Sequence, residues 1–188
     1  MKNLTLALII LSMTFSCQPK EKEVDKVQMV KDYVSALNSF DFEGIVSKFQ
    51  DSVRLKEIVY ESHFSREEYY HLFQWDSIFQ PKYEILEIEE AEDGTVKMHV
   101  SKAGPRILFL NKKPIITDEV VQFEGDKIQS VQITDYIVFD EVTWTNTRKD
   151  LLSWINANHP ELNGFLHDQT KQGALNYMKA LEYYQASH

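Results

Sequence analysis

The sequence predicts an α+β fold in which helices come first and an antiparallel sheet follows. Three observations lead to this prediction. Apolar side chains recur at spacings of three and four over residues 25–38, as on an amphipathic helix. Residues 83–139 alternate apolar and polar side chains between turn sequences, as strands do. Residues 141–188 return to helical spacing, and the chain of 188 residues is long enough for one domain with a buried core.

The N-terminal elements can be placed from their caps and apolar positions. The first helix has one apolar face, made by Val27, Val30, Val34 and Leu37. Asp41 is a candidate N-cap for a short second helix, and residues 53–60 have enough β-branched side chains for a strand. Residues 65–68 read SREE, a capping box in which Ser65 and Glu68 each bond the other's backbone amide. We therefore expect a third helix from this point to a residue before Pro81.

The predicted sheet is a meander, in which consecutive strands are antiparallel neighbours. Its strands are expected at residues 83–89, 95–100, 115–123 and 128–139. Turns that contain glycine separate the first pair of strands and the last pair. We expect residues 106–110 to continue the second strand after an interruption at Gly104 and Pro105.

The C-terminal segment is expected to form helices that pack over the sheet or across the mouth of the domain. Thr147 and Asp150 are candidate caps of its first helix. Pro160 is expected to begin a short turn, and Asp168 to cap a final helix. One side of that final helix should be apolar, with Leu175, Met178 and Leu181.

The start of the chain has the features of a targeting segment. Residues 4–15 are almost entirely apolar, follow a short positive start, and are too few to span a membrane comfortably. The only cysteine, Cys17, comes directly after this run. One interpretation is an ordinary secretory signal with an incidental cysteine. The other is that residues 14–17, TFSC, resemble the lipobox of a bacterial lipoprotein signal.

The lipobox resemblance implies a signal peptide at residues 1–16, lipidation of Cys17 by acyl chains such as palmitate, and a polar tether at residues 17–25. The protein would then be anchored in the membrane of the cell envelope through Cys17. Gln18 stands where an aspartate would resemble an inner-membrane retention signal, so the expected location is the outer membrane. The KEKE run at residues 20–23 resembles export signals of Bacteroidetes lipoproteins, but a solvated tether has the same composition.

Composition argues against several other classes of function. The net charge of −9 argues against non-specific nucleic-acid binding, which needs clustered Lys and Arg. The sequence has no His-Glu-x-x-His motif, no pair of cysteines and no glycine-rich phosphate loop. We therefore expect neither a metal ion nor another cofactor.

The stretch VSALNSFDFEGIVSKFQDSVRL at residues 34–55 resembles the nuclear transport factor 2 (NTF2) superfamily, including its SnoaL-like branch. The resemblance covers residues 26–140 and leaves residues 141–188 as a helical extension. It implies a cone in which a curved antiparallel sheet wraps the N-terminal helices and leaves an apolar cavity. Some members are isomerases or dehydratases of small polycyclic molecules, and others bind ligands or proteins, or only dimerise.

Candidate site residues follow from the expected cavity. In the last strand, Asp135 is in phase with Val131 and Ile133, so we predict that it points inward and serves as a catalytic carboxylate. His63 is a second catalytic candidate, and the candidate ligand-binding residues are Tyr60, Tyr69, Phe73, Trp75 and Asp118. The alternatives are that Asp135 lies at an exposed strand end or in an ion pair, that the aromatic residues are only core, and that Asp118 faces either way.

These observations support two functions of different kinds. The first is a lipid-anchored binding or interaction module of the cell envelope, with a small apolar molecule or a protein as its ligand. The second is a cofactor-independent isomerase or dehydratase that uses a cavity carboxylate for proton transfer. A homodimer formed through the open face of the sheet is a third alternative.

Overall fold

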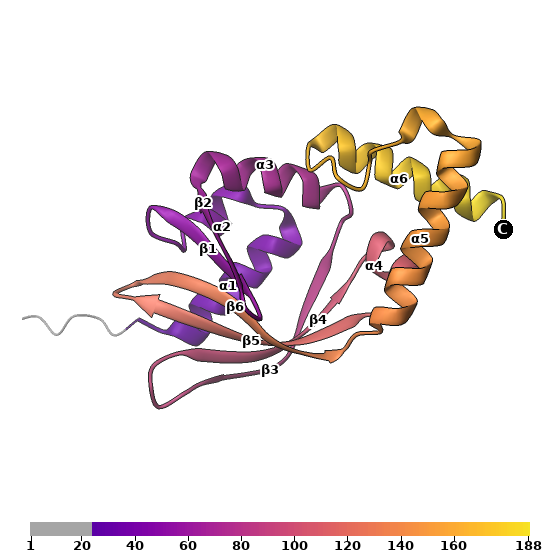
Figure 1. Cartoon of the computed structure of the whole chain (residues 1–188). Helices are drawn as coiled ribbons and strands as arrows, with labels where there is room; N and C mark the ends of the chain where they lie inside the picture. Colours follow the sequence, from indigo (N-terminus) through magenta and orange to yellow (C-terminus); the bar gives the residue numbers. More distant parts are fainter. Residues whose placement is uncertain (1–23) are drawn as a thin grey trace, which may run out of the picture.

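The computed structural model describes residues 24–188, so the predicted signal peptide, Cys17 and most of the tether lie outside the described residues. Figure 1 shows the described elements. In chain order they are α1 (Lys26–Ser39), α2 (Phe42–Val46), β1 (Ser52–Glu57), β2 (Tyr60–Ser65), α3 (Arg66–Ser77), β3 (Lys82–Glu90), β4 (Val96–Ala103), α4 (Pro105–Asn111), β5 (Ile115–Glu124), β6 (Lys127–Val138), α5 (Glu141–Asn158), the 3₁₀ turn Pro160–Leu162 and α6 (Lys171–Ala186). Within residues 24–188, no helix combines the length and the apolar character needed to cross a membrane.

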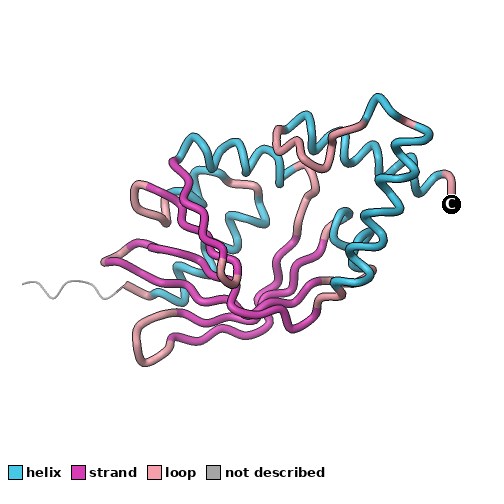
Figure 2. Tube along the Cα trace, viewed as in Figure 1, coloured by secondary structure: helices cyan, strands magenta, loops and turns pink. Residues whose placement is uncertain are grey.

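One six-stranded sheet, in the order β2-β1-β6-β5-β4-β3, organises the fold (Figure 2). Strands β3 to β6 form the predicted antiparallel meander. Strand β1 joins β6 in parallel, with Leu55 opposite Val131, and is antiparallel to β2. The sheet curves around α1 and α2, whose apolar faces pack on it. The predicted fold class is confirmed: an α+β cone in which a curved sheet wraps the N-terminal helices, with a helical C-terminal extension.

The caps predicted from sequence are present in the N-terminal half. Helix α1 has the predicted bounds to within one residue. The Asp41 side chain accepts a hydrogen bond from the Gly44 amide at 3.0 Å and caps α2. The capping box also forms, because the Ser65 amide donates to Glu68 Oε2 at 2.8 Å and the Glu68 amide donates to Ser65 Oγ at 3.2 Å. Local side-chain chemistry therefore determines where these helices begin.

Two strand predictions are wrong. The expected strand at 53–60 ends at Glu57, and after a turn at Ile58 and Val59 the chain returns as β2. Residues 106–110 form helix α4 and do not continue β4. Pro105 is tolerated at the first position of α4, where its missing amide proton costs no helical hydrogen bond. Phe109 is buried against the C-terminal helices, so tertiary packing favours the helix there.

The caps predicted in the C-terminal segment are also shifted. Helix α5 begins at Glu141 because Asp140, and neither Thr147 nor Asp150, accepts a hydrogen bond from the Thr143 amide, at 2.9 Å. The cap of α6 is Thr170, and Asp168 in turn accepts from the Thr170 amide at 2.9 Å. The predicted turn at Pro160 is confirmed. The buried side of α6 differs from the predicted one in part, since Leu175 is exposed and the small residues Gly173, Ala174 and Ala180 are buried.

The described residues form two apolar cores. The first fills the cone between α1, α2 and the sheet. The second, which we call the helical layer, joins α4, α5 and α6 to the end of α3 through residues such as Phe79, Phe109, Leu151 and Tyr177. Helix α5 rises from the end of β6, and α6 returns to pack against α3, so the extension lies across one end of the cone (Figure 1).

Candidate functional site

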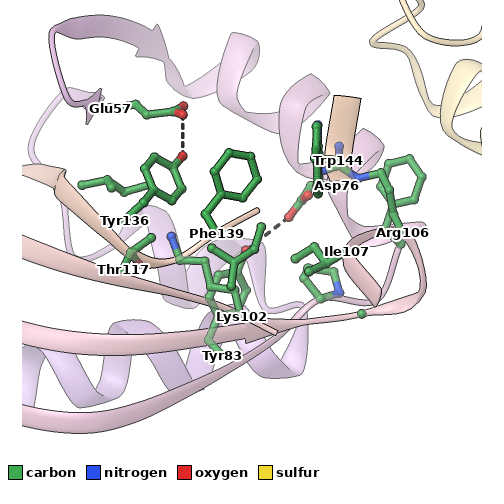
Figure 3. Close-up of a pocket in the computed structure, with 15 residues that line it drawn as sticks. Glu57, Asp76, Tyr83, Lys102, Arg106, Ile107, Thr117, Tyr136, Phe139 and Trp144 are labelled. Atoms are coloured by element: carbon green, nitrogen blue, oxygen red, sulfur yellow. Dashed lines mark hydrogen bonds between the residues drawn. The ribbon is translucent and has the colours of Figure 1, made fainter. Parts of the chain in front are cut away.

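A cavity of about 390 Å³ lies where the cone meets the helical layer (Figure 3). Its walls come from α3, from β1 and β3 to β6, and from both α4 and α5. The lining residues are Glu57, Asp76, Phe79, Pro81, Tyr83, Lys102, Gly104, Arg106, Ile107, Ile115, Thr117, Ile133, Tyr136, Phe139 and Trp144. A larger hollow of about 880 Å³ adjoins it and shares Glu57, Asp76, Pro81, Tyr83, Lys102 and Ile133. The cavity is therefore apolar over much of its wall but contains several titratable side chains.

Asp76 is the carboxylate on the α3 side of the cavity. Its nearest hydrogen-bond partner is the Tyr83 hydroxyl, which donates to Asp76 Oδ2 over a long 3.5 Å. Burial raises the pKa of Asp76 above its ordinary value of 3.8, and the positive charges of Arg106 and Lys102 offset only part of that effect. Burial also raises the pKa of Tyr83, which stays protonated. Asp76 thus has the environment of a carboxylate that can accept and return a proton.

Tyr83 is positioned by the end of α1. The Asn38 side chain donates to the Tyr83 carbonyl at 2.7 Å and accepts from the Tyr83 amide at 2.8 Å. Both backbone groups at the start of β3 are thereby satisfied by one amide side chain. This contact fixes the strand beside α3, so the Tyr83 ring enters the cavity next to Asp76 (Figure 3).

A buried ion pair occupies the sheet side of the cavity. Lys102 Nζ lies 2.5 Å from Glu119 Oε1, and Glu119 is only 6% exposed. The Thr117 hydroxyl donates to the same carboxylate at 2.9 Å. The Glu119 carboxylate, which accepts from the Thr117 hydroxyl, balances the charge of Lys102 within the sheet.

Tyr136 and Glu57 close one rim of the cavity. The Tyr136 hydroxyl donates to Glu57 Oε1 at 2.5 Å, and burial together with this carboxylate raises the pKa of the tyrosine. The inward direction of Tyr136 depends on a β-bulge in β6. Asp118 pairs with Asp135 and Glu119 pairs with Ile133, so Thr134 is an extra residue that reverses the alternation of side chains.

Arg106, in the first turn of α4, is held among aromatic rings. Its guanidinium carbon lies 5.0 Å from the ring centroid of Trp75, 4.9 Å from that of Phe79 and 5.9 Å from that of Trp144. A Cβ at Gly104 would lie 3.2 Å from the Phe79 carbonyl oxygen, so glycine lets the chain pass this close before α4 begins without displacing that backbone. This close approach brings Arg106 to the aromatic residues.

The structure places the predicted catalytic residues outside this cavity. Asp135 was expected to point inward, and that expectation is wrong: the bulge at Thr134 turns it to the exposed face while Ile133 and Tyr136 point in. His63 is exposed on β2, with Nε2 2.6 Å from Glu61 Oε1, at the rim of the larger hollow.

The predicted ligand-binding residues are divided among three places. Tyr60, Tyr69 and Phe73 line the larger hollow, although Tyr60 is 77% exposed. Trp75 lines neither cavity and stacks behind Arg106, with its Nε1 buried and without a hydrogen-bond partner in the described residues. Asp118 lies on the outer face of the sheet, where it pairs with His99.

Sequence reasoning missed Asp76, Lys102, Glu119 and Arg106. Three of them follow the same spacing rule that identified the core. Asp76 is seven residues after buried Tyr69 on one helix, Lys102 is in phase with Met98 and Val100, and Glu119 is in phase with Val121. Arg106 has no such signal, because the sequence pattern predicts a strand at residues 106–110. Within residues 24–188, no group of three or more His, Cys, Asp or Glu side chains is arranged to hold a metal ion.

No family model matches this chain, and no curated protein matches it. Solved structures resemble it in fold. An NTF2-like protein of unknown function from Cytophaga hutchinsonii is 14% identical, with 62% of this chain and 93% of that chain covered and a TM-score of 0.48. A protein from Kribbella flavida is 10% identical, with 66% and 93% covered and a TM-score of 0.50. A protein with a ketosteroid isomerase-like fold from Catenulispora acidiphila, in complex with trimethylamine, is 14% identical, with 56% and 82% covered and a TM-score of 0.45.

Proposed function

We propose that this protein binds a small molecule in the cavity between the cone and the helical layer, and that it does so as a lipid-anchored protein of the cell envelope. The observation that carries the binding proposal is the cavity itself, which has about 390 Å³ of space and several polar side chains that point into it. Cavities of this size with a mostly apolar wall and a few convergent polar groups are typical of small-molecule sites.

The free-energy cost of burying charged side chains in the cavity wall supports a binding role over a purely structural one. Asp76, Lys102 and Arg106 are charged groups set among apolar walls, and burial of a charge disfavours folding unless the charge is used or compensated. Lys102 is compensated by Glu119, but Asp76 has only a long contact with Tyr83. Groups kept in an unfavourable environment beside a cavity are candidates for contact with a ligand.

The membrane anchor is supported by the sequence of the first residues. An apolar run followed by a single cysteine and a polar, charged stretch is the arrangement of a lipoprotein signal and tether. Acyl chains on Cys17 would hold the described domain at the membrane surface.

The test of binding is native mass spectrometry of the full chain, extracted with detergent from the envelope of cells that express it. We expect a bound molecule that is released on activation. Ile107→Trp fills the cavity and should abolish this extra mass, whereas Leu108→Trp should keep it, because Leu108 is 45% exposed and does not line the cavity. A wild-type chain without a bound molecule, or equal retention of the bound molecule in both variants, contradicts the proposal. The same spectra show whether the chain is a homodimer.

The test of anchoring is the mass of the N-terminal peptide from the same preparation. A peptide that begins at Cys17 and carries acyl chains supports the proposal. A free thiol at Cys17, or a first residue after it, means an ordinary secretory signal.

A second candidate function is proton transfer, favoured by the raised pKa of Asp76 beside the Tyr83 hydroxyl. In this role Asp76 removes a proton from carbon and returns it elsewhere, and the Tyr83 hydroxyl exchanges its long contact with Asp76 for a hydrogen bond to the oxygen that gains charge. The molecule released from the protein can be incubated with it in D₂O. Deuterium uptake that wild type catalyses and Asp76→Asn does not supports the enzyme, while equal uptake without protein contradicts it.

A further inference from the structure

The nitrogen atoms of Arg106 have no acceptor in the described part of the chain. Its Nε is buried without a hydrogen-bond partner, and Arg106 forms no ion pair with any carboxylate within residues 24–188. A guanidinium has five N–H donors, and a buried donor without an acceptor destabilises the folded state. The guanidinium is therefore available to an acceptor on a ligand.

The aromatic rings around Arg106 do not supply that acceptor. The faces of Trp75, Phe79 and Trp144 attract the positive charge and hold the guanidinium in one orientation. Arg106 is half-buried, and its Nε is shielded from solvent, which strengthens the interaction of the guanidinium with a negative group that reaches it. Trp75 adds a second buried donor without a partner, Nε1, next to Arg106. Because Trp75 lines neither cavity, Arg106 is the donor of this pair that a ligand in the cavity can reach.

The other cation of the cavity is already paired. Lys102 Nζ lies 2.5 Å from Glu119, whose carboxylate also accepts from Thr117. Among the lining residues that the structure describes, Arg106 is the cation without a carboxylate contact. A negative group on a ligand would thus be directed to the α4 end of the cavity.

The rest of the wall suits an apolar body with a single acidic group. Ile107, Ile115, Ile133 and Phe139 line the cavity beside Arg106. Asp76 and Glu57 also line it; the charge of Arg106 already acts on Asp76, and the two carboxylates would repel a second negative group on the ligand. The planar fork of a guanidinium matches the two oxygens of a carboxylate.

We propose that the ligand of this cavity is an amphipathic acid, an apolar body that carries one carboxylate, and that the carboxylate binds the guanidinium of Arg106. This inference rests on the proposed binding function and names the class of ligand that the same cavity takes.

The experiment compares 2-naphthoate with its neutral relative 2-naphthamide, by calorimetric titration of the detergent-extracted full chain. We expect the acid to bind about tenfold more tightly than the amide, as hydrogen bonds to a charged group contribute more than neutral ones. Arg106→Gln should lower the affinity for the acid about tenfold and change the affinity for the amide by less than about twofold. Arg106→Lys, which keeps the charge but loses the fork, should lie between them. Arg148→Gln is the matched control, because Arg148 is exposed on α5, and this variant should bind both probes as wild type does.

Each outcome decides between the proposals. Equal affinity for acid and amide overturns the acid proposal and leaves small-molecule binding intact. Binding of neither probe by wild type counts against the acid proposal, and an empty chain in the native mass spectrum then counts against binding as well. Equal loss of both probes in Arg106→Gln means that Arg106 only shapes the wall. If Arg106→Gln does not fold, the acid and amide affinities of wild type still decide the matter.

Discussion

The cone and the helical layer bury different kinds of residue. The helical layer is formed almost entirely by apolar side chains, and its buried polar residue, Asn111, is fully used: it donates to the Lys113 carbonyl and accepts from the Asp140 amide. The cone instead buries Thr117, Glu119 and Ser130 on β5 and β6; Thr117 lines the cavity and Glu119 lines the adjoining hollow. The comparison indicates that the helical layer stabilises the fold, closes the cavity and contributes Arg106 to its wall, while the sheet of the cone contributes the ion pair of Lys102 and Glu119.

The largest expected effect concerns the buried ion pair of the cone. Lys102→Met leaves Glu119 buried without its cation and should lower the free energy of unfolding by about 4 kcal/mol. Lys97→Met, on the exposed face of the same strand, should change it by less than about 0.5 kcal/mol. Urea unfolding measures both values. Similar effects of the two substitutions would mean that the cone does not depend on this pair.

The next prediction tests whether the two regions unfold together. Ile45 in the cone and Ile155 in the helical layer are both 0% exposed, so each substitution by alanine should destabilise by about 3 kcal/mol. Because Arg106 and the aromatic residues around it join the regions, we expect one cooperative transition that shifts in both variants. Leu175→Ala, at a position that is 38% exposed, is the control with a small effect. Two separate transitions in calorimetry would show that the extension folds independently.

A smaller effect is expected from the helix caps, one in each region. Ser65→Ala removes the cap of α3, and Thr170→Ala removes the cap of α6. Each should cost about 1 kcal/mol in the free energy of unfolding, because one amide at the helix start loses its acceptor. Glycine in place of either residue should cost only a few tenths of a kcal/mol. A cost confined to one helix would mean that the two regions do not respond alike to local changes.

The smallest expected effect is a difference in pH dependence at Asp76. Its pKa is raised in the folded protein, so the native state holds the proton more tightly than the unfolded state does. This contribution to stability is complete below about pH 3.8, is lost as the pH rises through the folded pKa, and then stays constant. The positive charges of Arg106 and Lys102 and the hydrogen bond from Tyr83 oppose the effect of burial on this pKa.

Asp76→Asn removes that dependence. The stability of the variant relative to wild type should therefore increase with pH from about 3.8 upward and then level off, as urea titrations at several pH values would show. Carboxylates whose pKa is lowered, such as Asp140 and Asp168, change stability with pH in the opposite direction. Their contributions are the same in both proteins and cancel when the two stabilities are subtracted. A constant difference over this range would mean that Asp76 is not perturbed.

The sequence was informative wherever a few neighbouring residues determine the structure. The capping box at Ser65, the cap at Asp41, the turn at Pro160 and the alternating strands were all predicted, because each depends on contacts within four residues. The caps of α5 and α6 were misplaced because several Asp and Thr residues near those starts can fill the same role.

The candidate site was predicted poorly for one main reason. Strict alternation along β6 predicts that Asp135 points inward, but the extra residue Thr134 reverses the alternation of side chains. A bulge depends on how β6 pairs with β5, so the local sequence pattern does not predict it. The helical spacing of Asp76 with Tyr69, in contrast, was present in the sequence and would have identified the carboxylate that does face the cavity.

The sequence by itself determined the order of helices and strands, the positions of most turns, and the α+β class, since these depend on periodicity and capping. Only the tertiary structure decided that residues 106–110 are a helix, that Arg106 sits among three aromatic rings, and that Trp144 of the extension forms a wall of the cavity. These features depend on contacts between residues tens of positions apart. Such contacts follow from how the cone and the helical layer pack together, and local propensity does not encode them.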